Sequence, residues 1–191
     1  MHDSLLQYIR QRSYSPLTEE DISLIEEAFI PKKLKKRQFL LQEGQICKYI
    51  AFIVKGATRQ YTIDEKGQKQ ILNLSIENWW TSDRESFQKG TPSIYNIDAW
   101  EDTDLLLLPK DNGYYTRVND IAAFNEMRIK LDDNNHMANQ QRLHMSINYS
   151  AELRYEDLIK RHPEFLQRFP QHMIASYLGI TKETLSRIRS R

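Results

Sequence analysis

The chain has 191 residues, of which 40% are hydrophobic and 28% are charged, and its formal net charge is +1. These values are typical of a globular protein with a substantial core and exclude a disordered chain. No segment reaches the roughly 18 uninterrupted apolar residues of a membrane span, and the first residues lack the apolar core of a signal peptide. We therefore expect a cytoplasmic protein with no membrane partner. The single cysteine, Cys47, excludes an internal disulfide and an iron–sulfur cluster held by cysteines.

The first 110 residues change from a helical to a strand-rich pattern. Residues 4–29 predict two short helices, because Ser15-Pro16 breaks the pattern and an acidic first turn follows. From residue 38 to residue 110, short runs rich in β-branched and aromatic residues alternate with turn signals such as Glu43-Gly44 and Lys55-Gly56. This alternation predicts a small antiparallel β-roll.

Residues 121–152 contain neither glycine nor proline and predict one long helix. An apolar track recurs every seven residues and a more polar companion track runs beside it, which is typical of a heptad seam. A single helix could instead pack on its own β-roll, but we favour a symmetric dimer because the seam is long for a small domain. Polar Asn134 could fix the register of that dimer or face a ligand. The two tracks are Phe124, Leu131, Ala138 and Met145, and Met127, Asn134, Gln141 and Asn148.

His162-Pro163 and Phe169-Pro170 then divide the remaining helical pattern into short pieces, because proline disfavours helix at the residue before it. The predicted fold class is α+β. An N-terminal antiparallel, jelly-roll-like β-roll with flanking helices is followed by a long dimerisation helix and an all-α C-terminal domain. The predicted boundaries are 1–116, 117–149 and 150–191.

Positive charge gathers at the C-terminal end of the chain. Residues 150–191 hold eight Lys or Arg and five Asp or Glu, a sum of +3, so the preceding 149 residues sum to −2. Between Thr181 and Arg191, four positive residues face one negative residue. This local excess could lie against phosphate, although many charged runs are only solvated faces.

Residues 171–191 carry the pattern of a helix-turn-helix. Ala175 is small where the two helices would cross, Gly179 suits a left-handed turn, and Thr181 is a good N-cap for the second helix. Arginine can bond guanine, glutamate can accept from cytosine, and serine can adapt to either. An ordinary helical hairpin is the alternative, but we favour DNA binding because spacing, cap, apolar pattern and charge agree. The predicted DNA-binding residues are Thr181, Lys182, Glu183, Ser186, Arg187 and Arg189.

With these motifs in place, nearly the whole chain resembles the Crp/Fnr family of bacterial transcription regulators. The resemblance rests on Glu43-Gly44, on Ile53 to Gly56, on the long helix, and on the pattern I-A-x-x-L-G-I-T-x-E-T-L-S-R that begins at Ile174. It implies a homodimer on a palindromic double-stranded DNA operator, with RNA polymerase as a candidate further partner. It also places Glu183, Ser186 and Arg187 where the Fnr branch reads base edges. Family members often continue into a β-hairpin wing, so the end at Arg191 implies a short branch or a shortened chain.

The cyclic-nucleotide motif of that family is degenerate here. In the matching stretch Ser82 replaces the family's glycine, Asp83 replaces the glutamate, and Ser93 or a neighbour replaces the phosphate-binding arginine. Arg84 could substitute for that arginine, but a surface arginine is the commoner case. We therefore predict no tight binding of cyclic AMP or cyclic GMP, and no cofactor; the identity of any effector stays open. Our candidate effector pocket consists of Trp80, Ser82, Asp83, Arg84, Ser93 and Asn134.

Two other functions compete with DNA binding. The β-roll and long helix could act on a protein partner, with a vestigial helix-turn-helix. A β-roll metalloenzyme would need clustered histidines, and all five histidines lie outside residues 38–110. Haem ligation by His136 or His144 stays open, but exposed helix histidines are far commoner. We find no nucleophile–base pair and no phosphate-binding glycine loop, so we do not expect an enzyme.

Overall fold

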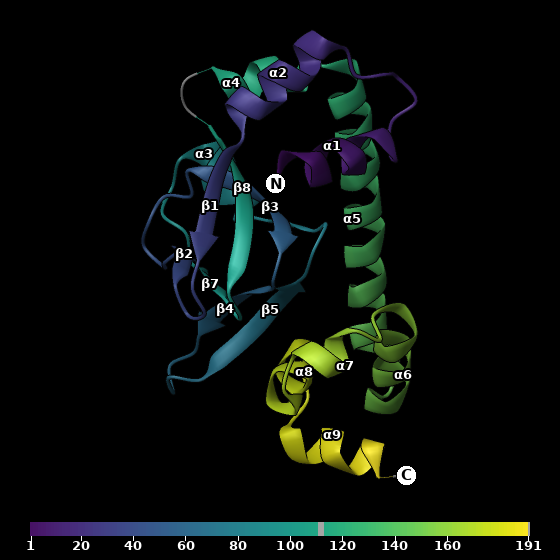
Figure 1. Cartoon of the computed structure of the whole chain (residues 1–191). Helices are drawn as coiled ribbons and strands as arrows, with labels where there is room; N and C mark the ends of the chain where they lie inside the picture. The colour runs from purple at the N-terminus through teal and green to yellow at the C-terminus, as the bar shows by residue number, and fades with distance from the viewer. Residues whose placement is uncertain (111–112, 191) are drawn as a thin grey trace. The chain divides into compact units, whose positions relative to one another are not determined.

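The computed structural model describes residues 1–110 and 113–190 (Figure 1). The chain divides into two compact units. The first comprises Met1–Thr62 and Asn73–Asp132, and the second comprises Ile63–Leu72 and Asp133–Arg191. The first unit holds most of the β-structure and the second holds the C-terminal helices.

The β-roll consists of two four-stranded sheets. One has the order β1-β8-β3-β6 and the other has the order β2-β7-β4-β5, and the register pairs within them are antiparallel. This confirms the predicted antiparallel roll. The strands are β1 (Ile30–Leu34), β2 (Phe39–Leu41), β3 (Tyr49–Lys55), β4 (Thr58–Ile63), β5 (Lys69–Ser75), β6 (Trp80–Thr81), β7 (Asn96–Ala99) and β8 (Thr103–Pro109).

The roll begins earlier than predicted, at Ile30 and not at residue 38. Pro31 weakens the strand signal of β1, and it is tolerated there because β1 lies at the edge of its sheet. The two predicted N-terminal helices are present, and the second begins with a capping box between Thr18 and Asp21. Two further short helices differ from the prediction: residues 84–89 lie within the range predicted as β-roll, and residues 114–119 span the predicted boundary between residues 116 and 117. The helices of this unit before the long one are α1 (His2–Arg10), α2 (Glu19–Ala28), α3 (Arg84–Lys89) and α4 (Tyr114–Asn119).

An aromatic cluster joins these helices to the roll. Trp80 contacts Phe52 with ring centroids 5.1 Å apart, and contacts Tyr8, Phe29 and Phe124 at 6.1 to 6.4 Å. The rings meet in tilted or edge-to-face geometry, which adds about 0.5–1.5 kcal/mol per pair beyond burial. Trp80 therefore packs against the core of the first unit.

The long helix is α5 (Ala122–Asn148), and it is shorter than the predicted 121–152. It ends there because the Ser150 hydroxyl caps the next helix, α6 (Ala151–Arg161), by accepting from the Leu153 amide. Phe124 and Met127, the first members of the predicted heptad tracks, are buried in the core of the first unit. At that end, therefore, the helix packs on its own β-roll.

The C-terminal helices of the second unit enclose a small core of their own. Proline precedes two of them, and Pro170 is the N-cap of α8. Phe165 is fully buried and packs edge-to-face on Phe169, with centroids 5.3 Å apart. These elements are α7 (Phe165–Arg168), α8 (Gln171–Leu178) and α9 (Lys182–Arg189). The structure thus has the predicted C-terminal all-α region.

Candidate nucleic-acid interface and effector region

The turn between α8 and α9 has the geometry that the sequence predicts. Gly179 adopts φ +67°, a conformation that side chains other than glycine seldom adopt. The Ile180 amide donates to the Ala175 carbonyl at 3.0 Å, and the Gly179 amide donates to Ser176, which together form a Schellman motif. Ala175 itself is buried. The turn therefore depends on Ala175 and Gly179, the two residues that the sequence predicts for it.

Two arginines also hold the carboxyl end of α8, and the sequence did not reveal them. Arg154 donates to the Leu178 carbonyl at 2.8 Å, and Arg142 donates to the Tyr177 carbonyl at 3.0 Å. Arg142 also lies over the Tyr177 ring, 4.2 Å from its centroid. Cations are favourable at a helix carboxyl end, where carbonyls lack partners. These side chains come from α6 and α5 and fix α8 within the second unit.

Helix α9 presents its predicted polar face to solvent. The Thr181 hydroxyl caps the helix by accepting from the Thr184 amide at 3.2 Å, while Leu185 is buried on the opposite side. Arg187 makes one long contact, 3.4 Å, to the Thr184 hydroxyl. Over residues 113–190 no ion pair involves the charged groups of this face. The exposed side chains are Thr181, Lys182, Glu183, Ser186, Arg187 and Arg189; Arg191 lies outside the described residues.

The candidate effector pocket of the first unit is different, because several of its polar groups are hydrogen-bonded to one another. Asp83 is the N-cap of α3 and is 5% exposed. Its carboxylate accepts from the Glu85 and Ser86 amides at 3.1 and 3.2 Å, and from the Ser93 hydroxyl at 2.6 Å. The Ser82 hydroxyl donates to the Tyr49 carbonyl at 3.2 Å. The Ser93 hydroxyl therefore bonds the buried Asp83 carboxylate, so these two candidate residues are partners of each other.

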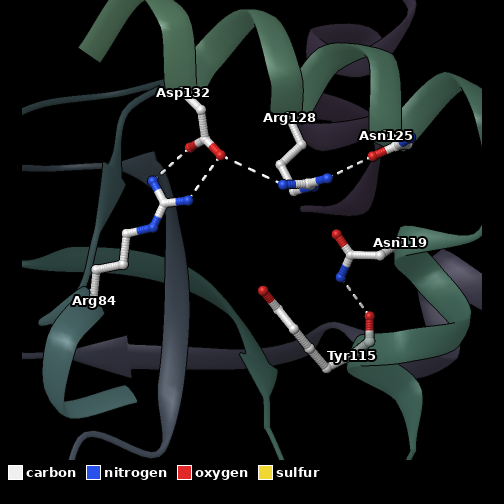
Figure 2. A network of polar contacts seen from close by, with 6 residues as sticks. All are labelled: Arg84, Tyr115, Asn119, Asn125, Arg128 and Asp132. Atoms are coloured by element: carbon white, nitrogen blue, oxygen red, sulfur yellow. Dashed lines mark hydrogen bonds and ion pairs between the residues drawn. The ribbon is translucent and has the colours of Figure 1, made fainter. Parts of the chain in front are cut away.

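Arg84 points to a different set of partners. It forms a two-pronged ion pair with Asp132 of α5, with nitrogen–oxygen distances of 2.6 and 2.8 Å (Figure 2). That hydrogen bond to Asp132, with the charge of the carboxylate, raises the pKa of the Arg84 guanidinium. Asn134 lies in the second unit and is exposed. The six candidate pocket residues are therefore not one cluster within the first unit.

Comparison with known proteins agrees with this architecture. Residues 31–113 match the family described as the cyclic nucleotide-binding domain. No curated protein matches the chain by sequence. The other matches are solved structures, and their similarity to this chain is in the fold.

Three solved structures illustrate the similarity. FixK2 from Bradyrhizobium japonicum shares 18% identity over 85% of this chain and 83% of its own, with a TM-score of 0.69. A CooA mutant from Carboxydothermus hydrogenoformans shares 17% identity over 93% of this chain and 84% of its own, also with a TM-score of 0.69. A putative transcriptional regulator of the Crp/Fnr family from Eubacterium rectale shares 18% identity over 90% and 82%, with a TM-score of 0.63. The chain thus has the fold of Crp/Fnr-type regulators, with a β-roll, a long helix and a helical C-terminal region.

No helix among the described residues is both long and apolar enough to cross a membrane. Within the same residues, no group of three or more His, Cys, Asp or Glu is arranged to hold a metal ion.

Proposed function

We propose that this protein is a sequence-specific DNA-binding transcription regulator that acts as a homodimer, with the β-roll unit as its regulatory module. The observation that carries the proposal is the polar face of α9. Its side chains are exposed, and its charged groups have no ion-pair partner in the described chain, whereas its apolar side is fixed by Leu185 and by the turn at Gly179. A helix held rigidly with its charges unpaired suits an external, charged partner. The fold shared with Crp/Fnr-type regulators supports the same function.

The chemistry of the face suits a major groove. Arg187 can donate two bonds to guanine, Glu183 can accept from cytosine, and Ser186 can adapt to either kind of base. Lys182 and Arg189 supply the charge that phosphates need. In a two-fold dimer the two copies of α9 would read half-sites about 34 Å apart.

The homodimer is supported by the exposed apolar side chains of α5. Met137, Leu143 and Ile147 are 57%, 62% and 72% exposed, which is unusual for a helix that no partner covers. They lie beside the predicted heptad tracks and not on them. Sedimentation at several protein concentrations tests the dimer directly.

Selection of bound sequences from a random duplex library tests DNA reading. We expect the wild-type protein to enrich a palindrome and the Arg187→Ala variant to lose preference at one position, a change of about 1–3 kcal/mol in discrimination. Arg161→Ala is the matched control, because it removes the same charge from α6 in the same unit. The assignment of Arg187 is wrong if both variants retain the full preference. Absence of any enriched sequence in the wild-type protein, with or without cell extract, would instead favour the protein-partner function.

Cyclic nucleotides are not expected to be the effector. In the family motif the phosphate needs a glycine amide and an arginine, and here the corresponding Ser82 and Ser93 hydroxyls are bonded to Tyr49 and Asp83. The buried Asp83 carboxylate also occupies the first amides of α3 and would repel a phosphate. We expect no heat of binding for cyclic AMP or cyclic GMP in calorimetry, and micromolar affinity would overturn this prediction.

A further inference from the structure

Two arginines of the first unit converge on a single carboxylate. Arg84 of α3 holds Asp132 through both of its terminal nitrogens, and Arg128, one turn earlier on α5, reaches the same carboxylate at 3.4 Å. Arg128 also donates to the Asn125 side chain at 2.6 Å. Two positive groups share one negative group, so this cluster carries an excess positive charge (Figure 2).

Several polar atoms around these arginines have no hydrogen-bond partner in the part of the chain that the structure describes. The Arg128 Nε atom is buried and makes no hydrogen bond within the described chain. The Asn119 amide nitrogen donates to the Tyr115 carbonyl at 2.5 Å, so its side-chain oxygen is left as an acceptor. Figure 2 shows the Tyr115 hydroxyl pointing toward the arginines, and no described residue accepts from it or donates to it. The Tyr115 ring is held in place by Phe87, with centroids 5.2 Å apart.

A buried donor without a partner costs free energy. The Tyr115 hydroxyl and the two guanidinium groups are all hydrogen-bond donors, and they lie near one another. Guanidinium groups bind planar oxyanions with two parallel hydrogen bonds. Asp132 satisfies that geometry for Arg84 but reaches Arg128 by only one long contact. The cluster therefore has more donors than Asp132 can satisfy.

We propose that Arg84, Arg128, Tyr115 and Asn119 form a binding site for a small oxyanion, with Asp132 as its built-in competitor. The ligand class is a carboxylate or phosphate that also carries a hydroxyl or amino group. The oxyanion replaces Asp132 on Arg84 and Arg128, Tyr115 donates to it, and the Asn119 oxygen accepts from the ligand's hydroxyl or amino group. The site shares Arg84 with the candidate effector pocket, but none of its four residues stands at Ser82 or Ser93, the positions that match the phosphate-binding glycine and arginine of the cyclic-nucleotide motif.

Binding at this site would also change the link between α3 and α5, because that link is the Arg84–Asp132 pair. Binding itself does not depend on the proposed function. Only the role of the ligand as a regulator of DNA binding rests on it. The test therefore contains no DNA, so that its failure leaves the proposed function untouched.

Calorimetric titration with acetate, glycolate and inorganic phosphate tests the site. We expect saturable binding to the wild-type protein, with glycolate about two- to tenfold tighter than acetate because its hydroxyl donates to Asn119. Asn119→Ala should abolish that preference and retain acetate binding. Asp132→Asn should tighten acetate binding roughly two- to fivefold, because the competing ion pair is partly exposed and therefore weak. Phosphate binding tighter than glycolate binding would assign the site to phosphate esters.

Arg84→Gln and Arg128→Gln should each abolish saturation. Lys89→Gln is the control, because it removes the same charge from the exposed Lys89–Glu85 pair of α3 and should leave binding unchanged. The Arg84 side chain is 58% exposed, so its substitution should leave the fold intact, and tryptophan fluorescence checks this. The proposal is overturned if no probe saturates either the wild-type protein or Asp132→Asn. Equal weakening by Lys89→Gln would overturn it too, because it would show general charge screening and not a site.

Discussion

Some charged side chains of the β-roll and those of helix α9 lie in opposite environments. The β-roll buries Asp83, Asp98 and Arg59 and pairs them with one another or with nearby donors. Helix α9 exposes Lys182 and Arg187, and neither has an acidic partner among residues 1–110 and 113–190. A buried and satisfied charge supports the structure that contains it, while an exposed charge on a rigid helix is available to another molecule. This difference is the reason for proposing α9 as the face that binds an external partner.

The clearest buried pair is Arg59 with Asp98, on adjacent strands β4 and β7. Two nitrogens of Arg59 donate to the two oxygens of Asp98 at 2.7 and 2.8 Å, and the side chains are only 10% and 2% exposed. Tyr61 donates to the same carboxylate at 3.3 Å. Burial lowers the pKa of Arg59, but the hydrogen bond and charge of Asp98 outweigh it and raise the pKa.

Removal of one partner of that pair should produce the largest effect. Asp98→Ala leaves the Arg59 charge buried without compensation, and we expect the free energy of unfolding to fall by about 3–5 kcal/mol. Urea unfolding followed by tryptophan fluorescence measures this in the first unit, because Trp79, Trp80 and Trp100 all lie there. Asp104→Ala is the control, since its pair with Lys33 is more exposed and longer, at 3.6 Å, and should cost less than about 1 kcal/mol. Similar losses of unfolding free energy in the two variants would contradict the expected difference between the buried pair and the exposed pair.

A smaller effect of the same cluster should appear at high pH. Burial, together with the nearby charge of Asp98, raises the pKa of Tyr61 to about 12, against 10.0 in the unfolded chain. The neutral phenol is favoured by folding, so its contribution is complete below pH 10 and is lost as the pH rises toward 12. Wild-type stability should fall by roughly 1 kcal/mol between pH 10 and pH 11 relative to Tyr61→Phe. Circular dichroism during urea unfolding measures both proteins, and parallel pH profiles would refute the assigned pKa.

The sequence could predict features that depend on neighbouring residues, but not contacts between distant segments. The turn at Gly179 and the cap at Thr181 were predictable because each is decided by residues within one helical turn. Arg84 and Asp132 are 48 positions apart, and Arg142 and Tyr177 are 35 positions apart, so no local spacing could have shown those contacts. At Asp83 the sequence showed only that a family residue had been replaced. The structure was needed to show that this carboxylate caps its own helix.

The smallest expected effect concerns the N-cap of the exposed helix α9. Thr181→Ala removes the hydroxyl that accepts from the Thr184 amide, and loss of such a cap costs about 1 kcal/mol. Because the cap sets the first turn of α9, we expect weaker DNA binding with an unchanged sequence preference, unlike Arg187→Ala. Thr181→Ser retains the acceptor and should bind as the wild-type protein does. Fluorescence anisotropy with the selected palindrome and with a scrambled duplex separates the two effects. Loss of preference in Thr181→Ala would mean that the cap hydroxyl itself contacts the bases.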